Sequence, residues 1–296
     1  MSVIVMTGAT AGLGAHAVQR LTGPGAQVII GARGSGGAPP TGCRVLPLDL
    51  ASLDSVRNFA DAVRSQVDGA AIDVLVLNAG AQFSRDDRRS ADGFEMTFAV
   101  NHLAHYLLAR SLLSGMASTG RIVFTTSDTH DPAVIPFGPK TLDVRALAHP
   151  PRRGSGFRAY AASKLCNLLT ARSLSALDEV KERGISVIAF NPGLTGGTAL
   201  LRGQTRVRRA LAPAVLPLAG ALLGRSHPQF HVGTPERAGE VLAELALGTA
   251  APPPGRVYAS LVKGEITFPD PSELARDDDA RDLLWRESAA MVGLPA

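Results

Sequence analysis

The sequence has 296 residues, of which 45% are hydrophobic and 19% are charged. This composition excludes a collagen-like or wholly disordered chain, and a net charge of only +4, spread along the sequence, argues against a nucleic-acid-binding protein. Cys43 and Cys166 form no CxxC pair or metal-ligand cluster, so we expect no disulfide, no bound metal and a cytoplasmic location.

Short β-branched segments alternate with segments of helical periodicity. The first segment, residues 3–6, runs straight into glycines and is not a signal peptide, and the longest apolar stretch, residues 211–224, is too short to span a membrane. Ser52 is a plausible N-cap for a helix over residues 53–67. This alternation predicts an α/β fold, a Rossmann-like doubly wound parallel sheet with helices on both faces. The predicted buried strands are residues 3–6, 28–30, 45–48, 74–77, 122–125 and 185–190.

A glycine-rich turn directly follows the first predicted strand and opens a helix. Its glycines allow a tight turn and let backbone N–H groups and the helix N-terminus approach a pyrophosphate. A simple strand-to-helix connection is the alternative. The spacing GxxxGxG differs from the GxGxxG of the commonest dinucleotide fingerprint. The turn reads Thr7, Gly8, Ala9, Thr10, Ala11, Gly12, Leu13, Gly14.

The residues after the second strand bear on which nucleotide the turn would bind. Ala32 and Arg33 stand where an NAD site places an acidic residue for the ribose hydroxyls. A guanidinium can contact a 2′-phosphate through two hydrogen bonds, so the sequence predicts NADP(H) in preference to NAD(H). A solvated surface arginine is the alternative interpretation of Arg33.

Tyr160 and Lys164 lie four residues apart in a predicted helix, so they share one helix face. A phenol has a reference pKa near 10, and a nearby cation favours the phenolate, which would make Tyr160 an acid–base group at neutral pH. Tyr160 would then exchange a proton with a substrate oxygen while a nicotinamide exchanges hydride with the carbon. The hydroxyl of Ser127, at the end of the fifth strand, would anchor that oxygen. Thr126 is the other candidate for this anchoring role, and the structural alternative is that Ser127 only caps the following turn.

These motifs resemble, in order, those of the short-chain dehydrogenase/reductase superfamily over residues 7–198. The resemblance implies that Asn101 completes the catalytic group by holding a water that links Lys164 to solvent, and that Lys164 also contacts the ribose. A helix-bending structural Asn101 is the alternative. His102 and His105 are interpreted as packing or surface residues rather than metal ligands.

The resemblance also implies further cofactor contacts after the strands. Asp49 and its neighbour would hold the adenine ring, although a helix cap or turn is an equal alternative for Asp49. The threonine that commonly follows the PG motif four residues past Gly193 is replaced here by Gly197, with Thr195 and Thr198 on either side. The implied positions are Asp49, Leu50, Asn78, Ala79, Gly80, Pro192, Gly193, Leu194 and Thr195.

Three segments, residues 101–105, 127–130 and 160–167, are most similar to the branch of retinol dehydrogenases, WW-domain oxidoreductases and protochlorophyllide reductases. The long interval 130–159 also fits that branch, and its five prolines predict an ordered segment without a long helix. Fold and motif do not fix a substrate, so none is named.

We expect one domain, residues 1–296, with a cofactor core of about residues 1–195, a substrate lid at 196–233 and C-terminal helices at 234–296, among them helices over residues 234–247 and 272–291. The apolar residues and arginines of the lid suit a bulky lipophilic ketone or aldehyde; a subunit interface or an anionic membrane surface are the alternatives. Homodimers and homotetramers are usual in families of this kind.

The sequence thus predicts an NADP(H)-dependent enzyme acting on a small-molecule carbonyl/alcohol pair. A nucleotide-binding regulatory or scaffolding protein without turnover is the alternative from another class. Light-driven reduction of a tetrapyrrole ring is a third hypothesis.

Overall fold

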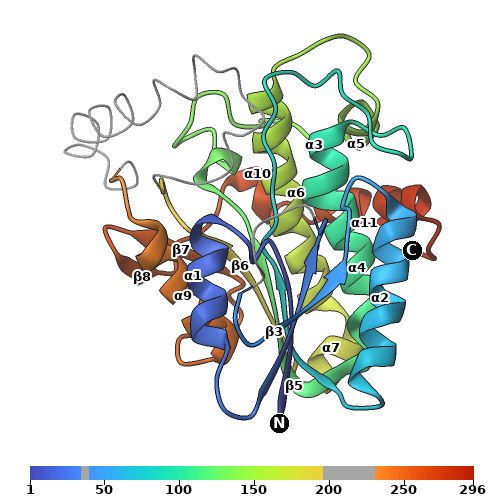
Figure 1. Ribbon diagram of the computed structural model, residues 1–296. Coiled ribbons are helices and arrows are strands. Elements are labelled where there is room, and N and C mark those ends of the chain that lie inside the picture. Colours follow the sequence, from blue (N-terminus) through green and yellow to red (C-terminus); the bar gives the residue numbers. More distant parts are fainter. Residues whose placement is uncertain (35–39, 196–230) are drawn as a thin grey trace.

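A single eight-stranded sheet organises the protein (Figure 1). The computed structural model describes residues 1–34, 40–195 and 231–296. The strand order is β3-β2-β1-β4-β5-β6-β7-β8, and neighbouring strands are parallel except that β8 runs antiparallel to β7. The strands are β1 (Ser2–Thr7), β2 (Ala26–Ala32), β3 (Cys43–Pro47), β4 (Ile72–Leu77), β5 (Met116–Thr125), β6 (Ser186–Asn191), β7 (Tyr258–Val262) and β8 (Glu265–Thr267).

The direction of the strand order reverses at β1. This strand pairs with β2 on one side and β4 on the other, so the chain winds outward from the centre in both directions. In such sheets a crevice opens beyond the carboxyl ends of the strands at the reversal, and ligands bind there. The predicted doubly wound fold is confirmed, and it places the ends of β1, β4 and β5 side by side.

Helices cover both faces of the sheet (Figure 1). The inner strands β1, β2, β4, β5 and β6 are rich in Val, Ile and Leu and are buried on both faces, as expected for parallel strands, whereas the edge strands β3 and β8 are only partly buried. One face packs on α1 (Gly12–Leu21) and α9 (Pro235–Leu247). The other face packs on α2 (Leu53–Val67), α4 (Ala104–Leu112), α6 (Gly156–Ala176) and α11 (Asp278–Val292).

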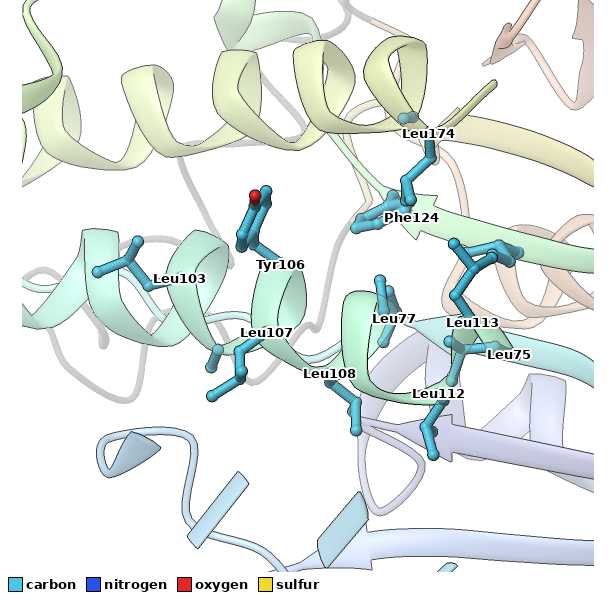
Figure 2. Packing of buried hydrophobic residues seen from close by; sticks show 14 of the residues in the cluster. Leu75, Leu77, Leu103, Tyr106, Leu107, Leu108, Leu112, Leu113, Phe124 and Leu174 are labelled. Carbon is cyan, nitrogen blue, oxygen red and sulfur yellow. The ribbon is translucent and has the colours of Figure 1, made fainter. Parts of the chain in front are cut away.

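The leucines of α4 form much of the core on the second face (Figure 2). Leu107, Leu108 and Leu112 are each at most 1% exposed. They lie near Leu77 of β4 and Phe124 of β5, which are fully buried. Burying one such side chain contributes about 1.5–3 kcal/mol, so this packing holds α4, and the turn that precedes it, firmly against the sheet.

Short elements connect this frame. Between Ser127 and the start of α6 at Gly156 there is no long helix, as predicted from the prolines of this segment. The short elements are α3 (Met96–Phe98), the π-helical turn η1 (Ala99–Leu103), η2 (Leu113–Gly115), η3 (Asp128–His130), α5 (Val144–Ala148), α7 (Asp178–Glu182) and α10 (Glu273–Arg276). Within the described ranges, every helix is too short or too polar to cross a bilayer.

The C-terminal part differs from the prediction in two ways. Residues 234–296 were expected to be helical, but they also contribute β7 and β8, which extend the sheet beyond residue 195. The single helix expected over residues 272–291 is divided at Asp277. The break occurs because Asp277 is extended and its side chain accepts from the Ala280 N–H, which starts a second helix.

Candidate active site

The glycine-rich turn follows β1 and packs tightly against itself. Gly8 has a φ of +69°, and a Cβ at Gly14 would lie 1.9 Å from the Gly8 carbonyl oxygen. Only glycine fits this close approach. Ala11 provides no side-chain cap to α1, so the first N–H groups of the helix remain for an anionic ligand. The turn therefore fits a dinucleotide pyrophosphate.

Hydrogen bonds join this turn to the ends of β4 and β5. Thr7 Oγ1 accepts from the backbone N–H groups of Asn78 and Ala79, both at 3.1 Å. The Asn78 amide donates to the Gly8 carbonyl oxygen at 2.9 Å and accepts from the Thr125 hydroxyl at 2.9 Å. These residues thus hold the three central strand ends in register, at the switch point of the sheet.

Arg33 and Asp49 follow β2 and β3. Arg33 is exposed and has no ion pair within the ranges that the structure describes, so its guanidinium is free to bind an anion. Asp49 Oδ1 accepts from the Ala51 N–H at 3.1 Å, so the carboxylate forms the turn that was one interpretation of this residue. Leu50 packs against the core beneath it.

Tyr160 and Lys164 are buried on α6 beside the end of β5. The Lys164 Nζ atom lies 5.5 Å from the centroid of the Tyr160 ring and donates to the Thr125 carbonyl oxygen at 3.0 Å. The Ser127 side chain hydrogen-bonds Tyr160. The structure therefore brings together the phenol, the ammonium and the hydroxyl that the sequence predicted.

The electrostatics of the tyrosine differ from the sequence expectation. Burial raises the pKa of Tyr160 to about 12, and the hydrogen bond with Ser127 lowers it by less. The sequence predicted that the neighbouring lysine lowers the pKa of the phenol. For the protein without a bound cofactor, this prediction is wrong. Burial also lowers the pKa of Lys164 to about 8, so the ammonium itself is easily deprotonated.

The structure gives the hydroxyls of Ser127 and Thr126 different hydrogen-bond partners. The Thr126 hydroxyl is buried and donates to the Lys164 carbonyl oxygen at 2.7 Å, so it is used in holding α6. Ser127 Oγ accepts from the Thr129 N–H at 3.3 Å, which is the turn-capping contact considered for it. Ser127 makes this contact in addition to its hydrogen bond with Tyr160.

Asn101 lies in the π-helical turn η1, where the Ala104 N–H bonds to the Ala99 carbonyl oxygen five residues back. Its side-chain oxygen accepts from the Ala81 N–H at 2.8 Å, and its amide donates to the Ala81 carbonyl oxygen and to Ser163 Oγ, both at 3.0 Å. Such π-turns occur often at functional sites. Asn101 thus lies in a distorted helical turn, and its side chain is rigidly held.

Gly80 lies between Asn101 and Lys164. A Cβ added there would be 3.4 Å from Lys164 Nζ and 3.7 Å from Asn101 Oδ1. The small residue therefore leaves these two polar groups facing one region of the site, as the predicted relay requires.

The turn after β6 is also held rigidly. Asn191 Oδ1 accepts from the Gly193 N–H at 3.0 Å, and the Thr195 hydroxyl donates to the Pro192 carbonyl oxygen at 3.1 Å. Leu194 lies between them and its carbonyl oxygen accepts from the Gly233 N–H at 2.8 Å. Residues 196–230, which include Thr198 and most of the expected lid, lie outside the described residues.

Sequence reasoning missed two residues that support this site. Ser163 bridges Asn101 and the Tyr160 carbonyl oxygen, to which it donates at 2.7 Å. His105 is fully buried and hydrogen-bonds Thr7, although it was interpreted as a packing or surface residue. The signal for His105 was its position four residues after Asn101, which places both on one helix face.

Comparison with known proteins identifies the family. A family model described as short chain dehydrogenase matches residues 2–136. Protochlorophyllide reductase A of Triticum aestivum is 31% identical over 325 residues, covering 99% of this chain and 80% of the relative. The chain belongs to the short-chain dehydrogenase family. It is an oxidoreductase of a family that binds NAD or NADP.

Two further similarities cover nearly the whole chain. The WW domain-containing oxidoreductase of Drosophila melanogaster is 29% identical over 301 residues, covering 97% of this chain and 68% of the relative. A solved structure of an uncharacterized protein from Mycobacterium paratuberculosis is 26% identical, with a TM-score of 0.72, covering 100% of this chain and 96% of that chain. The resemblance to this branch, predicted from three short segments, is confirmed.

Proposed function

We propose that the protein is an NADP(H)-dependent oxidoreductase that interconverts a carbonyl compound and an alcohol, with Tyr160 as the acid–base group. The observation that carries this proposal is the convergence of Tyr160, Ser127 and Lys164 at the end of β5. Beside them lies a glycine turn that fits a pyrophosphate.

The protonation state of Tyr160 favours carbonyl reduction. With a pKa of about 12, the phenol carries its proton at neutral pH and can donate it to a carbonyl oxygen. Ser127, which hydrogen-bonds Tyr160, would hold that oxygen and stabilise its developing negative charge. A bound nicotinamide would supply the hydride.

Lys164 and Asn101 would return the proton to Tyr160. One hydrogen of the ammonium is donated to the Thr125 carbonyl oxygen, which leaves two for ribose hydroxyls or water. Because three hydrogen bonds with Ala81 and Ser163 fix the Asn101 side chain, it can keep a water in a constant place beside Lys164. This relay connects the buried phenol with solvent.

The proposed class of substrate is argued from the amino-acid sequence. The apolar residues of 196–230 favour a bulky lipophilic ketone or aldehyde, and the exposed Arg33 favours the 2′-phosphate of NADP(H). The cytoplasmic location, the single domain and a homo-oligomeric assembly also stay predictions.

Replacing Tyr160 by phenylalanine tests the proposal. Tyr160→Phe removes only the proton donor, so we expect turnover of a carbonyl substrate to fall about 10²- to 10⁴-fold while the Kd for NADPH is unchanged. Tyr106→Phe is the matched control, because Tyr106 is buried on α4 and its hydroxyl donates to the Trp285 carbonyl oxygen, away from the site. NADPH consumption at 340 nm and fluorescence titration measure both quantities.

Other outcomes would overturn the proposal. Equal turnover in Tyr160→Phe and the wild type would remove Tyr160 from the mechanism. A wild-type protein that binds NADPH but reduces no aliphatic, aromatic or steroidal ketone would favour the regulatory alternative. A coloured pigment in the absorbance spectrum would favour tetrapyrrole reduction.

A further inference from the structure

His105 joins the cofactor turn to the catalytic asparagine. Its side chain is fully buried in the first turn of α4. Its Nε2 atom lies 3.0 Å from Thr7 Oγ1, and its Nδ1 atom lies 2.9 Å from the Asn101 carbonyl oxygen. Thr7 and Asn101 are far apart in the sequence, so this ring is a direct bridge between two separate parts of the site.

The hydrogen-bond partners determine where the imidazole carries its proton. A carbonyl oxygen only accepts, so the Asn101 contact requires a hydrogen on Nδ1. In a neutral ring, Nε2 is then an acceptor, and the Thr7 hydroxyl must donate to it. Thr7 can do so, because its two lone pairs take the N–H groups of Asn78 and Ala79. Every donor in this chain of hydrogen bonds therefore meets an acceptor.

The ring is also neutral in charge. Burial lowers the pKa of His105 to about 4, the hydrogen bond to Asn101 opposes this shift, and the positive charge of Lys164 adds to it. A second proton on Nε2 would face the Thr7 hydroxyl, which already donates toward it. The bridge is thus built for one tautomer.

We propose that His105 is a positioning residue, which fixes the glycine turn relative to Asn101. This inference rests on the proposed function. Ala81 and Ser163 hold the Asn101 side chain by hydrogen bonds, and His105 holds its backbone carbonyl oxygen. Thr7 meanwhile sets the distance between the turn and β4. Without the imidazole, the cofactor turn and the asparagine would lose their common support.

His102 provides the matched comparison. It is equally buried on the neighbouring helical turn, but its Nε2 atom lies 2.8 Å from Ser288 Oγ of α11. None of its described hydrogen bonds reaches Thr7 or Asn101. The same substitution at His102 therefore removes a buried imidazole without touching the bridge.

Three variants test the inference. His105→Phe removes both contacts, and we expect kcat to fall at least 10-fold and the Kd for NADPH to rise, since small displacements of positioned groups are costly. His105→Asn can place an amide N–H near the position of Nδ1 but cannot reach Thr7, so it should recover kcat more than NADPH affinity. His102→Phe should lower the unfolding temperature but leave kcat and Kd as in the wild type. Equal effects of the phenylalanine at both positions on kcat and Kd would overturn the inference, and so would asparagine recovering neither quantity.

A second measurement needs no turnover. The ¹⁵N NMR spectrum of the histidine rings should show His105 as the Nδ1–H tautomer between pH 6 and 8, with or without NADPH. An Nε2–H tautomer, or titration near pH 6.5, would overturn the bridge. If the wild type bound NADPH but reduced no carbonyl, the proposed function would fail, while this spectrum and the NADPH affinities would still test the contact with the cofactor turn.

Discussion

Arg33 stands directly after β2, with its guanidinium exposed at the carboxyl edge of the sheet. A hydrogen bond between charged groups is worth about 1.5–3 kcal/mol, which corresponds to roughly 10- to 100-fold in affinity. We therefore expect Arg33→Ala to raise the KM for NADPH about 10- to 100-fold and to leave the KM for NADH nearly unchanged. Steady-state kinetics with both cofactors measure the ratio.

Arg44→Ala is the matched control for this substitution. Arg44 is an exposed arginine on β3, but it pairs in register with Ile29, three residues before Ala32 on β2. Its loss removes the same charge without reaching the predicted phosphate site. A preference for NADPH that survives Arg33→Ala, or that falls equally in Arg44→Ala, would contradict the assignment.

Which residues could be predicted depended on how far apart their partners lie in the sequence. The pair Tyr160 and Lys164 was predictable because four residues separate them on one helix. For His105, spacing could indicate the contact with Asn101, four residues earlier, but not the contact with Thr7, which is 98 residues away. The pKa of Tyr160 was mispredicted for a related reason: a neighbouring cation can be read from spacing, but burial depends on the whole fold.

At the scale of elements, the glycine turn and the start of α1 form one close-packed unit. A Cβ at Gly14 would lie 1.9 Å from the Gly8 carbonyl oxygen and 2.6 Å from Asn78 Nδ2. Since Asn78 also bonds this carbonyl, Gly14→Ala must displace the turn. We expect it to abolish measurable NADPH binding and to lower the free energy of unfolding by about 1–3 kcal/mol.

Gly23→Ala is the control for this prediction. Gly23 lies just after the same helix, and a Cβ there would meet no atom within 4 Å. The alanine should leave NADPH affinity unchanged and alter the free energy of unfolding by less than about 1 kcal/mol. Fluorescence titration and urea unfolding compare the two variants. Wild-type NADPH affinity in Gly14→Ala would contradict the close-packed turn.

The elements that the sequence predicted share a strong local signal. Ser52 caps α2 as its sequence pattern predicts, and Thr234 caps α9 in the same way, each by accepting an N–H three residues later. β7 lacked such a signal, because Tyr258–Val262 contains alanine and serine and follows a proline-rich loop. Its strand conformation comes from pairing with β6, a contact between distant parts of the chain.

At the scale of the whole molecule, the C-terminal helix α11 is built into the core. Arg110 of α4 stacks on the ring of Trp285, with its guanidinium carbon 4.6 Å from the ring centroid, and donates to the Pro295 carbonyl oxygen at 2.9 Å. Arg57 of α2 donates to the Val292 carbonyl oxygen at 2.8 Å. These contacts favour the prediction that the C-terminal part folds together with the cofactor core as one domain.

Leu284→Ala tests that prediction. Leu284 of α11 is 1% exposed and belongs to the core cluster that includes α2, α4 and α6, so we expect its truncation to lower the free energy of unfolding by about 2–5 kcal/mol. Leu247→Ala is the control, because Leu247 is 47% exposed and its truncation should cost less than about 0.5 kcal/mol.

The fluorescence of Trp285 allows urea unfolding of the Leu284→Ala variant to test whether the protein unfolds cooperatively. It is the single tryptophan of the chain and lies on α11, so its fluorescence follows this helix, whereas circular dichroism follows all helices and strands. In one cooperative domain, Leu284→Ala must shift both urea transitions together, to the same lower midpoint. A fluorescence transition that precedes the loss of circular dichroism would show that α11 unfolds separately, and the one-domain prediction would then be wrong.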